Sequence, residues 1–471
     1  MIDTYATARS MLANLKAKKV SARELLAAHI AQNDRIAKKI NAVTETDIPR
    51  AEKDADAIDA ARARGEPLGP LAGLPLTIKD GFDVENMPAW SGNPALKDRP
   101  KNVPDATVVA DTRKAGAVIW AKTNVPFMLS DIQSYNAIHG TTNNPYDVTK
   151  VPGGSSGGAA AALATGVTPL EIGSDIGGSL RHPANFCGIS SLKPTWGALS
   201  GRGHVPPVAY YECDLGVYGP MARNVDDLKL LWSILNHSAE QPRRDIKGSR
   251  VAIWNEEATW PLARDVKAGT ERAGEALAKA GVHVEHAKPD IDGAYLMDFY
   301  LTILTSIIGA GLPSALLDAW EAQRPQDRKL AAQGDRGAGY RLAATASARD
   351  VYAANVKQQA YKDKLADFFM RYDAIVMPIS MVTAFPHNQE VAFNDRVLDL
   401  DGKQVPYSGI LNWISPATAL HAPALAVPAG QAAAGLPVGV QVVGPWHGED
   451  RLFDFAAAIE DGLGGFKRPP L

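Results

Sequence analysis

Glycine is concentrated in one stretch of this chain of 471 residues, and that stretch constrains the fold more than any other feature. Twelve of the 41 glycines lie between Gly153 and Gly203. Glycine at this density indicates backbone that turns tightly, adopts positive φ or lies against a ligand. Serines 155, 156, 174 and 179 lie inside the stretch. A serine flanked by glycines has accessible N–H groups beside its hydroxyl, which a serine nucleophile with an oxyanion hole requires.

Several blocks of this sequence resemble one known family. The glycine-rich stretch reads GGSSGG at 153–158, GSDIGGSLRHPA at 173–184 and FCGISSLKPT at 186–195. These blocks resemble the amidase signature family, whose hydrolases and amidotransferases cleave C–N bonds with a Ser–Ser–Lys triad. Further resemblance lies in GLPLTIKDGFDV at 73–84, YDAIVMPIS at 372–380, PALAVPAG at 423–430 and GLPVGVQVVG at 435–444. Residues 241–371 match least well.

The resemblance implies a role for each member of the triad. Ser179 is the nucleophile, and Ser155, which lies 24 residues earlier, relays the proton. The peptide bond before Ser155 is cis in the family. The adjacent Ser156 is the nearest rival for the relay, but the spacing favours Ser155. The oxyanion hole is formed by the backbone amides of Ile176, Gly177, Gly178 and Ser179.

Lys79 is the general base that the resemblance implies. A solvated lysine has a pKa of about 10.4 and cannot accept a proton at neutral pH. Burial in a low-dielectric site depresses that pKa by several units. The apolar residues 74–78 predict a strand that delivers Lys79 to such a site. Asp80 is a candidate counter-charge, although on a strand it points to the opposite face.

The resemblance implies one α/β domain over residues 1–471, although the length alone suggests two or three domains. Its fold is a large, mixed and mostly buried β-sheet sandwiched between helical layers. Within it we expect an N-terminal helical segment at 1–65, a catalytic core at 73–203 and a variable substrate-pocket segment at 241–371. Ser21 and Glu24 form a capping box that starts one of the N-terminal helices.

Short apolar runs alternate with helical patterns after residue 71, which favours a buried sheet between helices. The predicted strands are 74–78, 117–121, 168–172, 251–254, 374–377, 424–427 and 438–443. Helices are predicted at 225–235, 265–280 and 349–372. Residues 299–312 are apolar but too short to span a bilayer, and Gly309, Gly311 and Pro313 interrupt them. We expect a buried helix there, near the substrate pocket.

Composition argues against several classes of partner. A net charge of −3 and the lack of a long basic run give no reason to expect nucleic acid. The hydrophobic content of 46% is that of an ordinary globular protein, and the N-terminus has no signal-peptide pattern. Two cysteines, Cys187 and Cys213, cannot form a disulfide framework, so we expect a cytoplasmic protein without a membrane partner. A homodimer is common in the family. No metal or organic cofactor is needed for the triad chemistry.

The substrate pocket is predicted from position alone. By its offset from the signature, Leu129 falls on a pocket-lining position, and Ser130 is beside it. Asn412 and Trp413 lie in a loop where the family varies with substrate. We expect Asp175 and Arg181 to brace the nucleophile loop rather than to bind substrate.

Two other motifs match formally. Residues 153–157 satisfy the G-x-S-x-G elbow of α/β-hydrolases, for which His421 and His447 are candidate partners. The elbow leaves the second serine loop unexplained. Residues 190–193 fit S-x-x-K, but no S-D-N or K-T-G accompanies them.

The expected activity is hydrolysis of a carboxylic amide through a Ser179 acyl-enzyme. Because residues 299–312 are apolar and a glutamine site needs charged groups, a stand-alone amidase for small apolar or aryl amides is the first interpretation. Esters and carbamates are accessible to the same acyl transfer. The alternative is the glutaminase (A-type) subunit of a tRNA-dependent amidotransferase, which passes ammonia to a partner.

Overall fold

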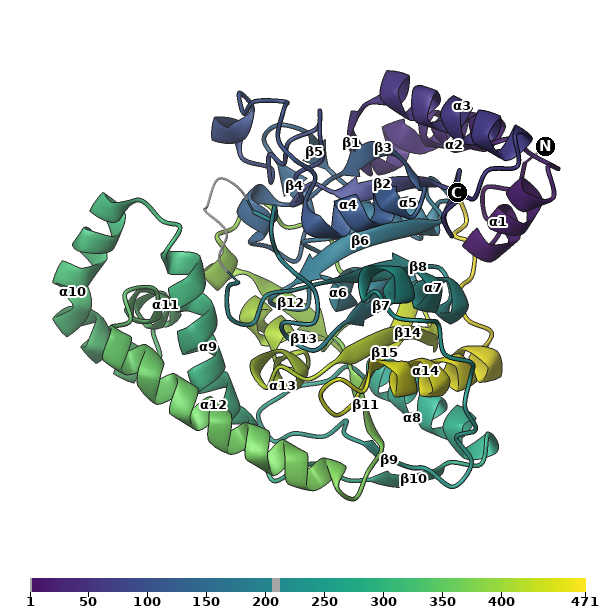
Figure 1. Ribbon diagram of the computed structural model, residues 1–471. Coiled ribbons are helices and arrows are strands. Elements are labelled where there is room, and N and C mark those ends of the chain that lie inside the picture. The colour runs from purple at the N-terminus through teal and green to yellow at the C-terminus, as the bar shows by residue number, and fades with distance from the viewer. Residues whose placement is uncertain (1, 206–211) are drawn as a thin grey trace.

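An eight-stranded sheet runs through the computed structural model, which describes residues 2–205 and 212–471 (Figure 1). The strand order is β10-β9-β11-β15-β14-β7-β8-β6. Strands β9–β10 and β9–β11 pair in parallel, and the other five pairs are antiparallel. The strands are β6 (Leu170–Asp175), β7 (Ser190–Lys193), β8 (Val217–Ala222), β9 (Arg250–Ile253), β10 (His283–His286), β11 (Ala374–Pro378), β14 (Ala424–Gln431) and β15 (Pro437–Val443).

Alternation along the strands separates two hydrophobic cores, one on each face of this sheet. Val251 and Ile253 belong to one core, whereas Ala252 between them belongs to the other. This period of two follows from the pleat, which points successive side chains to opposite faces. One face is covered by α7 (Val225–Leu235), α8 (Arg264–Lys279) and α14 (Glu449–Leu463). The other is covered by α5 (Gly157–Ala164), α6 (Arg181–Cys187) and α9 (Gly293–Gly309). The predicted α/β fold with a mixed, buried sheet between helical layers is confirmed.

A smaller sheet carries the proposed base. It has the order β1-β3-β2, formed by β1 (Val43–Thr46), β2 (Pro75–Lys79) and β3 (Val118–Thr123). The N-terminal helices α1 (Ala8–Lys16), α2 (Ala22–Ile40) and α3 (Ile48–Ala63) and helix α4 (Thr107–Lys114) belong to the same end of the molecule (Figure 1). The hydroxyl of Thr77 on β2 donates to Glu171 on β6 at 2.5 Å, so the two sheets meet beside Lys79.

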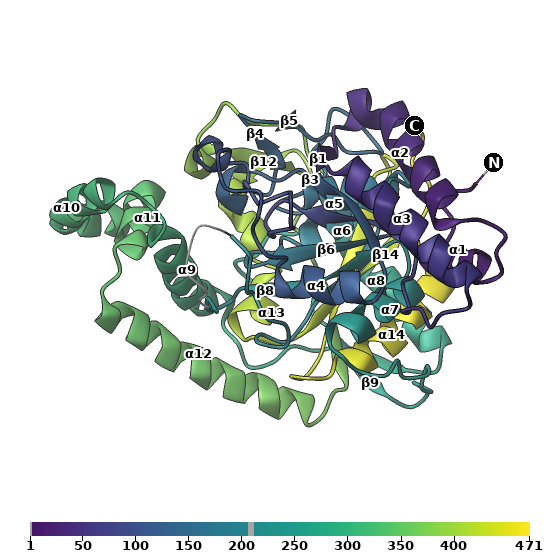
Figure 2. The same ribbon diagram turned by 45° about the horizontal axis from the view of Figure 1, so that its top comes forward.

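Helices α9 to α12 form an arm that extends away from the sheet in both views (Figures 1 and 2). Its outer elements are α10 (Ser314–Ala332), α11 (Arg336–Ala344) and α12 (Ala348–Phe369). Most of α10 is exposed, whereas α9 buries Leu296, Phe299 and Ile303 against the body. Helix α9, which lies within the predicted pocket segment 241–371, contacts the nucleophile loop through Tyr300, as described below.

Most of the predicted elements are present, with some omissions. All seven predicted strands and the three predicted helices occur near their predicted positions. The capping box of Ser21 and Glu24 also forms. Strands β1, β7, β8 and β10 were not predicted from the sequence, nor were the hairpins β4 (Tyr135–Asn136) with β5 (Gly140–Thr141) and β12 (Val397–Leu400) with β13 (Lys403–Pro406). Helices α4, α6, α10, α11 and α14 and the short helix α13 (Ser415–Ala419) were not predicted either. No helix within the described ranges is long and apolar enough to cross a membrane. The single-domain interpretation stays a prediction.

Close packing of α5 generates a stability prediction. A Cβ added to Gly158 would lie 2.3 Å from the backbone nitrogen of Asn124 and 2.6 Å from its backbone carbonyl oxygen. Gly158→Ala is therefore expected to lower the free energy of unfolding by about 1–3 kcal/mol, despite the better helix propensity of alanine. The control is Gly339→Ala in α11, where no atom lies within 4 Å of the added Cβ. There the unfolding free energy should rise by about 0.5–1 kcal/mol. Denaturant unfolding measures both, and equal effects of the two substitutions would contradict this account.

Candidate active site

Lys79 ends strand β2 with its amine buried among hydroxyl groups. Its side chain is 0% exposed. The Nζ atom lies 2.8 Å from the Ser155 hydroxyl, 2.9 Å from the Ser174 hydroxyl and 3.3 Å from the Ser174 carbonyl oxygen. Asp80 does not serve as its counter-charge, because that carboxylate pairs with Lys122 at 3.1 Å on the other face of the strand.

Burial shifts the ionisation of Lys79 toward the neutral amine. Loss of solvation lowers the pKa of Lys79 to about 7, and the negative charge of Asp175, together with the ionised fraction of Glu171, only partly opposes the shift. A large fraction of the amine is therefore neutral at physiological pH. This geometry fits the predicted role of Lys79.

The serine loop presents Ser155 to this amine. The Gly154–Ser155 peptide bond is cis, as the resemblance implies. Ser155 is 2% exposed and contacts Lys79, whereas the Ser156 hydroxyl donates to the Ser174 carbonyl oxygen at 3.4 Å. Of the two hydroxyls, that of Ser155 is the one in contact with the Lys79 amine, and its role as the proton relay stays a prediction.

Ser179 lies in a loop that is stabilised by a buried ion pair between residues of the same loop region. Asp175 and Arg181 are both fully buried and lie 3.1 Å apart. Burial alone would raise the pKa of the Asp175 carboxyl, but the Arg181 guanidinium outweighs it and holds that pKa below its usual range. The Ser156 N–H donates to the Ser179 carbonyl oxygen at 3.3 Å, which brings the two serine loops side by side. Asp175 and Arg181 thus brace the loop as predicted.

The backbone amides of this loop are only partly available to a substrate. The Gly178 N–H donates to the Asp175 carboxylate at 2.8 Å, so it already has an acceptor, and its role in the oxyanion hole stays a prediction. The N–H groups of Ile176, Gly177 and Ser179 donate to no acceptor among the described residues. These three amides remain candidates for the oxyanion hole. Gly178 has φ of 89°, a conformation that favours glycine.

The predicted pocket residues lie in different environments. Leu129 is half-buried, and its Cδ1 would be 3.0 Å from a Cβ on Gly81, two residues from Lys79. Ser130 is exposed and donates to the Met128 carbonyl oxygen. Asn412 is half-buried at the end of a 3-10 helix. The Trp413 side chain is fully buried, and its indole donates to the Pro261 carbonyl oxygen, so it faces the core rather than the nucleophile loop.

Three residues that the sequence did not indicate contact the nucleophile loop instead. The Tyr300 hydroxyl of α9 donates to the Ile176 carbonyl oxygen at 3.2 Å. A Cβ added to Gly177 would lie 3.5 Å from a Leu411 methyl group, and one added to Gly178 would lie 3.2 Å from the Ile414 side chain. Leu411 and Ile414 flank the predicted pair at 412–413, so the same loop contacts the nucleophile loop through neighbouring side chains, and the pocket role of Asn412 and Trp413 stays a prediction.

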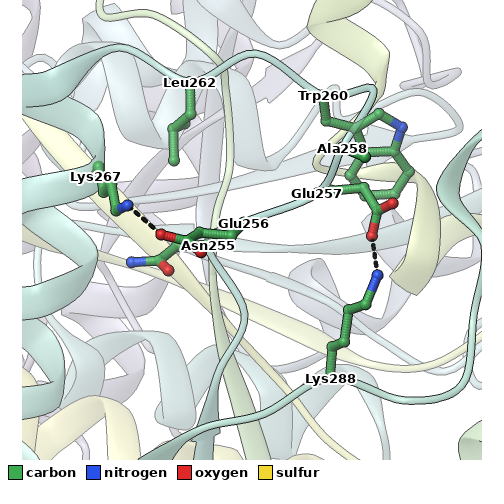
Figure 3. Close-up of a pocket in the computed structure, with 8 residues that line it drawn as sticks. All are labelled: Asn255, Glu256, Glu257, Ala258, Trp260, Leu262, Lys267 and Lys288. Carbon is green, nitrogen blue, oxygen red and sulfur yellow. Dashed lines mark hydrogen bonds and ion pairs between the residues drawn. The ribbon is translucent and has the colours of Figure 1, made fainter.

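A surface cavity of about 420 Å³ lies apart from these residues, beside Trp260 (Figure 3). Two ion pairs, Lys267–Glu256 at 2.5 Å and Lys288–Glu257 at 2.6 Å, border it. The Trp260 ring packs edge-on against Trp413 at 5.3 Å. None of the described residues that line the cavity belongs to the triad.

The rival motifs do not assemble in space. His421 pairs with Asp214 at 2.6 Å and stacks on Trp196, away from Ser155. Ser190 and Lys193 lie on strand β7, where the lysine amine donates to the carbonyl oxygens of Pro194 and Ala422.

Comparison with known proteins assigns the family. The family model described as Amidase matches residues 24–453. The chain belongs to the amidase signature family. The A-type subunit of the glutamyl-tRNA(Gln) amidotransferase of Salinispora arenicola is 32% identical, and the alignment covers 100% of both chains. A protein from a vestigial complex related to the origins of an s-triazine catabolic enzyme is 26% identical, with a TM-score of 0.82 over 98% of this chain and 100% of that one. A bacterial aryl acylamidase of the amidase signature family, 22% identical with a TM-score of 0.81 over 97% and 96% of the two chains, supports the fold alone.

Membership of the amidase signature family assigns amide C–N hydrolysis as the reaction class, and it corrects the predicted partners. From the net charge of −3 and the lack of a long basic run, the sequence predicts a stand-alone enzyme with a small-molecule amide substrate, no nucleic acid and a possible homodimer. That prediction is wrong. Eight curated relatives, 27% to 33% identical, carry the name of one subunit of an amidotransferase for glutamyl-tRNA(Gln). The apolar character of α9 has a packing explanation: Leu296, Phe299, Ile303 and Leu304 are buried in the core, and the Tyr300 hydroxyl donates to the Ile176 carbonyl oxygen in the nucleophile loop. Burial against the core accounts for much of the hydropathy of this segment, so the hydropathy alone does not indicate an apolar substrate.

Glu171 behind Lys79 generates a pH-dependent stability prediction. Burial raises the pKa of Glu171 to about 8. The hydrogen bonds that Thr77 and Thr123 donate to this carboxyl group lower the pKa and only partly offset the effect of burial. Because the unfolded pKa is about 4.3, the stability that protonated Glu171 contributes is complete below about pH 4 and is lost as the pH rises toward 8.

In the Glu171→Gln variant, the side chain at position 171 is uncharged at every pH. The midpoint of thermal unfolding of this variant, relative to the unmodified protein, should therefore increase steadily between about pH 5 and pH 8. A difference that stays constant with pH would contradict the assignment of a protonated Glu171.

Proposed function

We propose that this chain is the amide-hydrolysing A-type subunit of a tRNA-dependent amidotransferase. In this role it cleaves the side-chain amide of glutamine through a Ser179 acyl-enzyme, and the ammonia passes to a partner subunit. The observation that carries the chemistry is the 2.8 Å contact between the buried Lys79 amine and the Ser155 hydroxyl. The end-to-end similarity to subunits of that name supports the substrate.

Acylation begins with proton transfer along the relay. Neutral Lys79 accepts the hydroxyl proton of Ser155, and Ser155 accepts that of Ser179. The Ser179 Oγ attacks the amide carbon, and the carbonyl π electrons move to oxygen. The N–H groups of Ile176, Gly177 and Ser179 hold the resulting oxyanion.

Collapse of this intermediate breaks the C–N bond. The same relay returns a proton from Lys79 through Ser155 to the departing nitrogen, so ammonia leaves as a neutral molecule and the acyl group stays on Ser179. Water then attacks the ester and gives its proton to the relay. Glutamate is released, and Ser179 regains its hydroxyl proton. Every proton taken by Lys79 is returned within the cycle.

The partner is the part of the proposal that a reconstitution experiment tests. The purified chain, alone and mixed with the remaining subunits of the Salinispora arenicola amidotransferase, is assayed for ammonia release from glutamine. Hydroxylamine is added in parallel, because it traps a glutamyl-enzyme as the hydroxamate. We expect glutamine turnover that rises on addition of the subunits, and Ser179→Ala should lower it by at least about a thousandfold.

The same assay includes an aryl anilide and a long-chain amide. Ser179-dependent hydrolysis of either one, with no glutamine turnover in the presence of the added subunits, would overturn the proposed substrate but retain the nucleophile. Glutamine turnover that survives Ser179→Ala would overturn the nucleophile.

A further inference from the structure

A second layer of hydrogen bonds lies behind the triad, around Ser174 and His204. The Ser174 hydroxyl lies 2.9 Å from the Lys79 amine and 2.8 Å from Nε2 of His204. The chain of contacts therefore runs from His204 through Ser174 and Lys79 to Ser155. The relay to Ser179 uses neither Ser174 nor His204.

The neighbouring backbone holds the imidazole in place. The N–H of Val205 donates to the Gly81 carbonyl oxygen at 2.8 Å, and that of Asp83 donates to the Gly203 carbonyl oxygen at 2.8 Å. The loop bearing His204 is thus paired with the segment that directly follows Lys79. The ring packs against Phe82 at 4.6 Å and Tyr218 at 4.9 Å.

The number of donors and acceptors at Lys79 and Ser174 decides which group donates in the hydrogen bond between Ser174 and His204. A neutral lysine amine has two N–H groups and one lone pair. The lone pair must face the Ser155 hydroxyl if Lys79 is to take its proton, so the two N–H groups point to the hydroxyl and carbonyl oxygens of Ser174. The Ser174 oxygen then accepts from Lys79, and its own proton needs another acceptor. Nε2 of His204 is the group within reach.

We propose that His204 is a positioning residue that accepts the Ser174 hydroxyl proton through Nε2 and thereby turns the lone pair of Lys79 toward Ser155. This role rests on the proposed function only in its use of Ser179 as the nucleophile. It does not depend on the identity of the amide or of the partner.

The opposite arrangement shows what His204 prevents. If Nε2 carried a proton, it would donate to Ser174, and the Ser174 hydroxyl would be free to donate to the lone pair of Lys79. The base would then be occupied before it could act. Burial, helped by the neighbouring Lys79 charge, lowers the pKa of His204 well below its usual value, which keeps the imidazole neutral. A neutral ring with its proton on Nδ1 satisfies the required direction.

The same contacts also help when Lys79 becomes charged during the reaction. The ammonium then has three N–H groups, and three oxygen acceptors lie around it: the two serine hydroxyls and the Ser174 carbonyl. The Ser174 hydroxyl can accept in both states of the lysine because His204 takes its proton. No hydroxyl has to rotate in the transition state, which keeps the site preorganised.

The test uses a fluorophosphonate probe that labels an activated serine, so that it needs no substrate. The second-order rate of Ser179 labelling is measured between about pH 6 and pH 9 for the full chain and its variants. His204→Phe keeps a ring against Phe82 and Tyr218 but removes the acceptor, whereas His204→Gln retains an acceptor oxygen. We expect labelling of His204→Phe to be at least about tenfold slower across this range, and His204→Gln to recover to within about threefold of the unmodified rate.

A double-variant cycle separates positioning from packing. Ser174→Ala should slow labelling about as much as His204→Phe, and the combined variant should be no slower than either within about twofold, because both act through one contact. His139→Phe is the matched control, since His139 stacks on Trp90 at 5.6 Å and belongs to a different loop. Its labelling rate should be unchanged.

Three outcomes would overturn the role of His204. These are labelling of His204→Phe at the unmodified rate, equal slowing in His204→Phe and His204→Gln with a matching loss of thermal stability, and additive losses in the double variant. If the unmodified chain is labelled at a residue other than Ser179, the proposed nucleophile fails together with this inference. Normal labelling that is insensitive to His204 would overturn this inference alone.

Discussion

Removal of one lysine amine from water is the constraint on which the rest of this site depends. Lys79 is fully buried at the end of β2, with serine oxygens as its nearest polar contacts. Desolvation disfavours the charged amine and so lowers its pKa into the neutral range. A carboxylate in direct contact would reverse this effect, because it would stabilise the ammonium. The neighbouring carboxylates of Asp80 and Asp175 are instead paired with other cations, Asp80 with Lys122 and Asp175 with Arg181.

The fold produces this environment by joining two sheets. Strand β2 belongs to the small N-terminal sheet and β6 to the edge of the large one, and Thr77 with Glu171 connects them. The ends of both strands therefore meet, which places Lys79 beside Ser174. The loop with Ser155 precedes β6 in the chain and leads directly into α5. The loop with Ser179 follows β6 and leads directly into α6. Burial on both faces of the sheet keeps water from the amine and fixes the loops around it.

The parts of the site that the sequence predicted are those carried by the backbone of the signature. Lys79, Ser155 and the brace of Asp175 with Arg181 lie where the motif spacing implies, because strand ends and glycine turns leave few alternative positions. Side-chain direction was not predictable in the same way. Trp413 turns into the core while Leu411 and Ile414 contact the loop, and Gly178 uses its N–H within the loop itself. The contact of His204 with Ser174 joins segments 30 residues apart, and no local pattern in the sequence marks it. The strands β7 and β8 were missed because serine, lysine, glycine and proline interrupt their apolar character.

The ionisation of Lys79 is the central claim, and it can be measured directly. Lysine labelled with carbon-13 at Cε is incorporated into the full chain, and the Lys79 signal is identified by its loss in Lys79→Met. Titration by nuclear magnetic resonance should show this signal changing near pH 7, as desolvation requires. A signal that instead titrates near about 10.4, the pKa of a solvated lysine, would contradict the account of Lys79 as a neutral base.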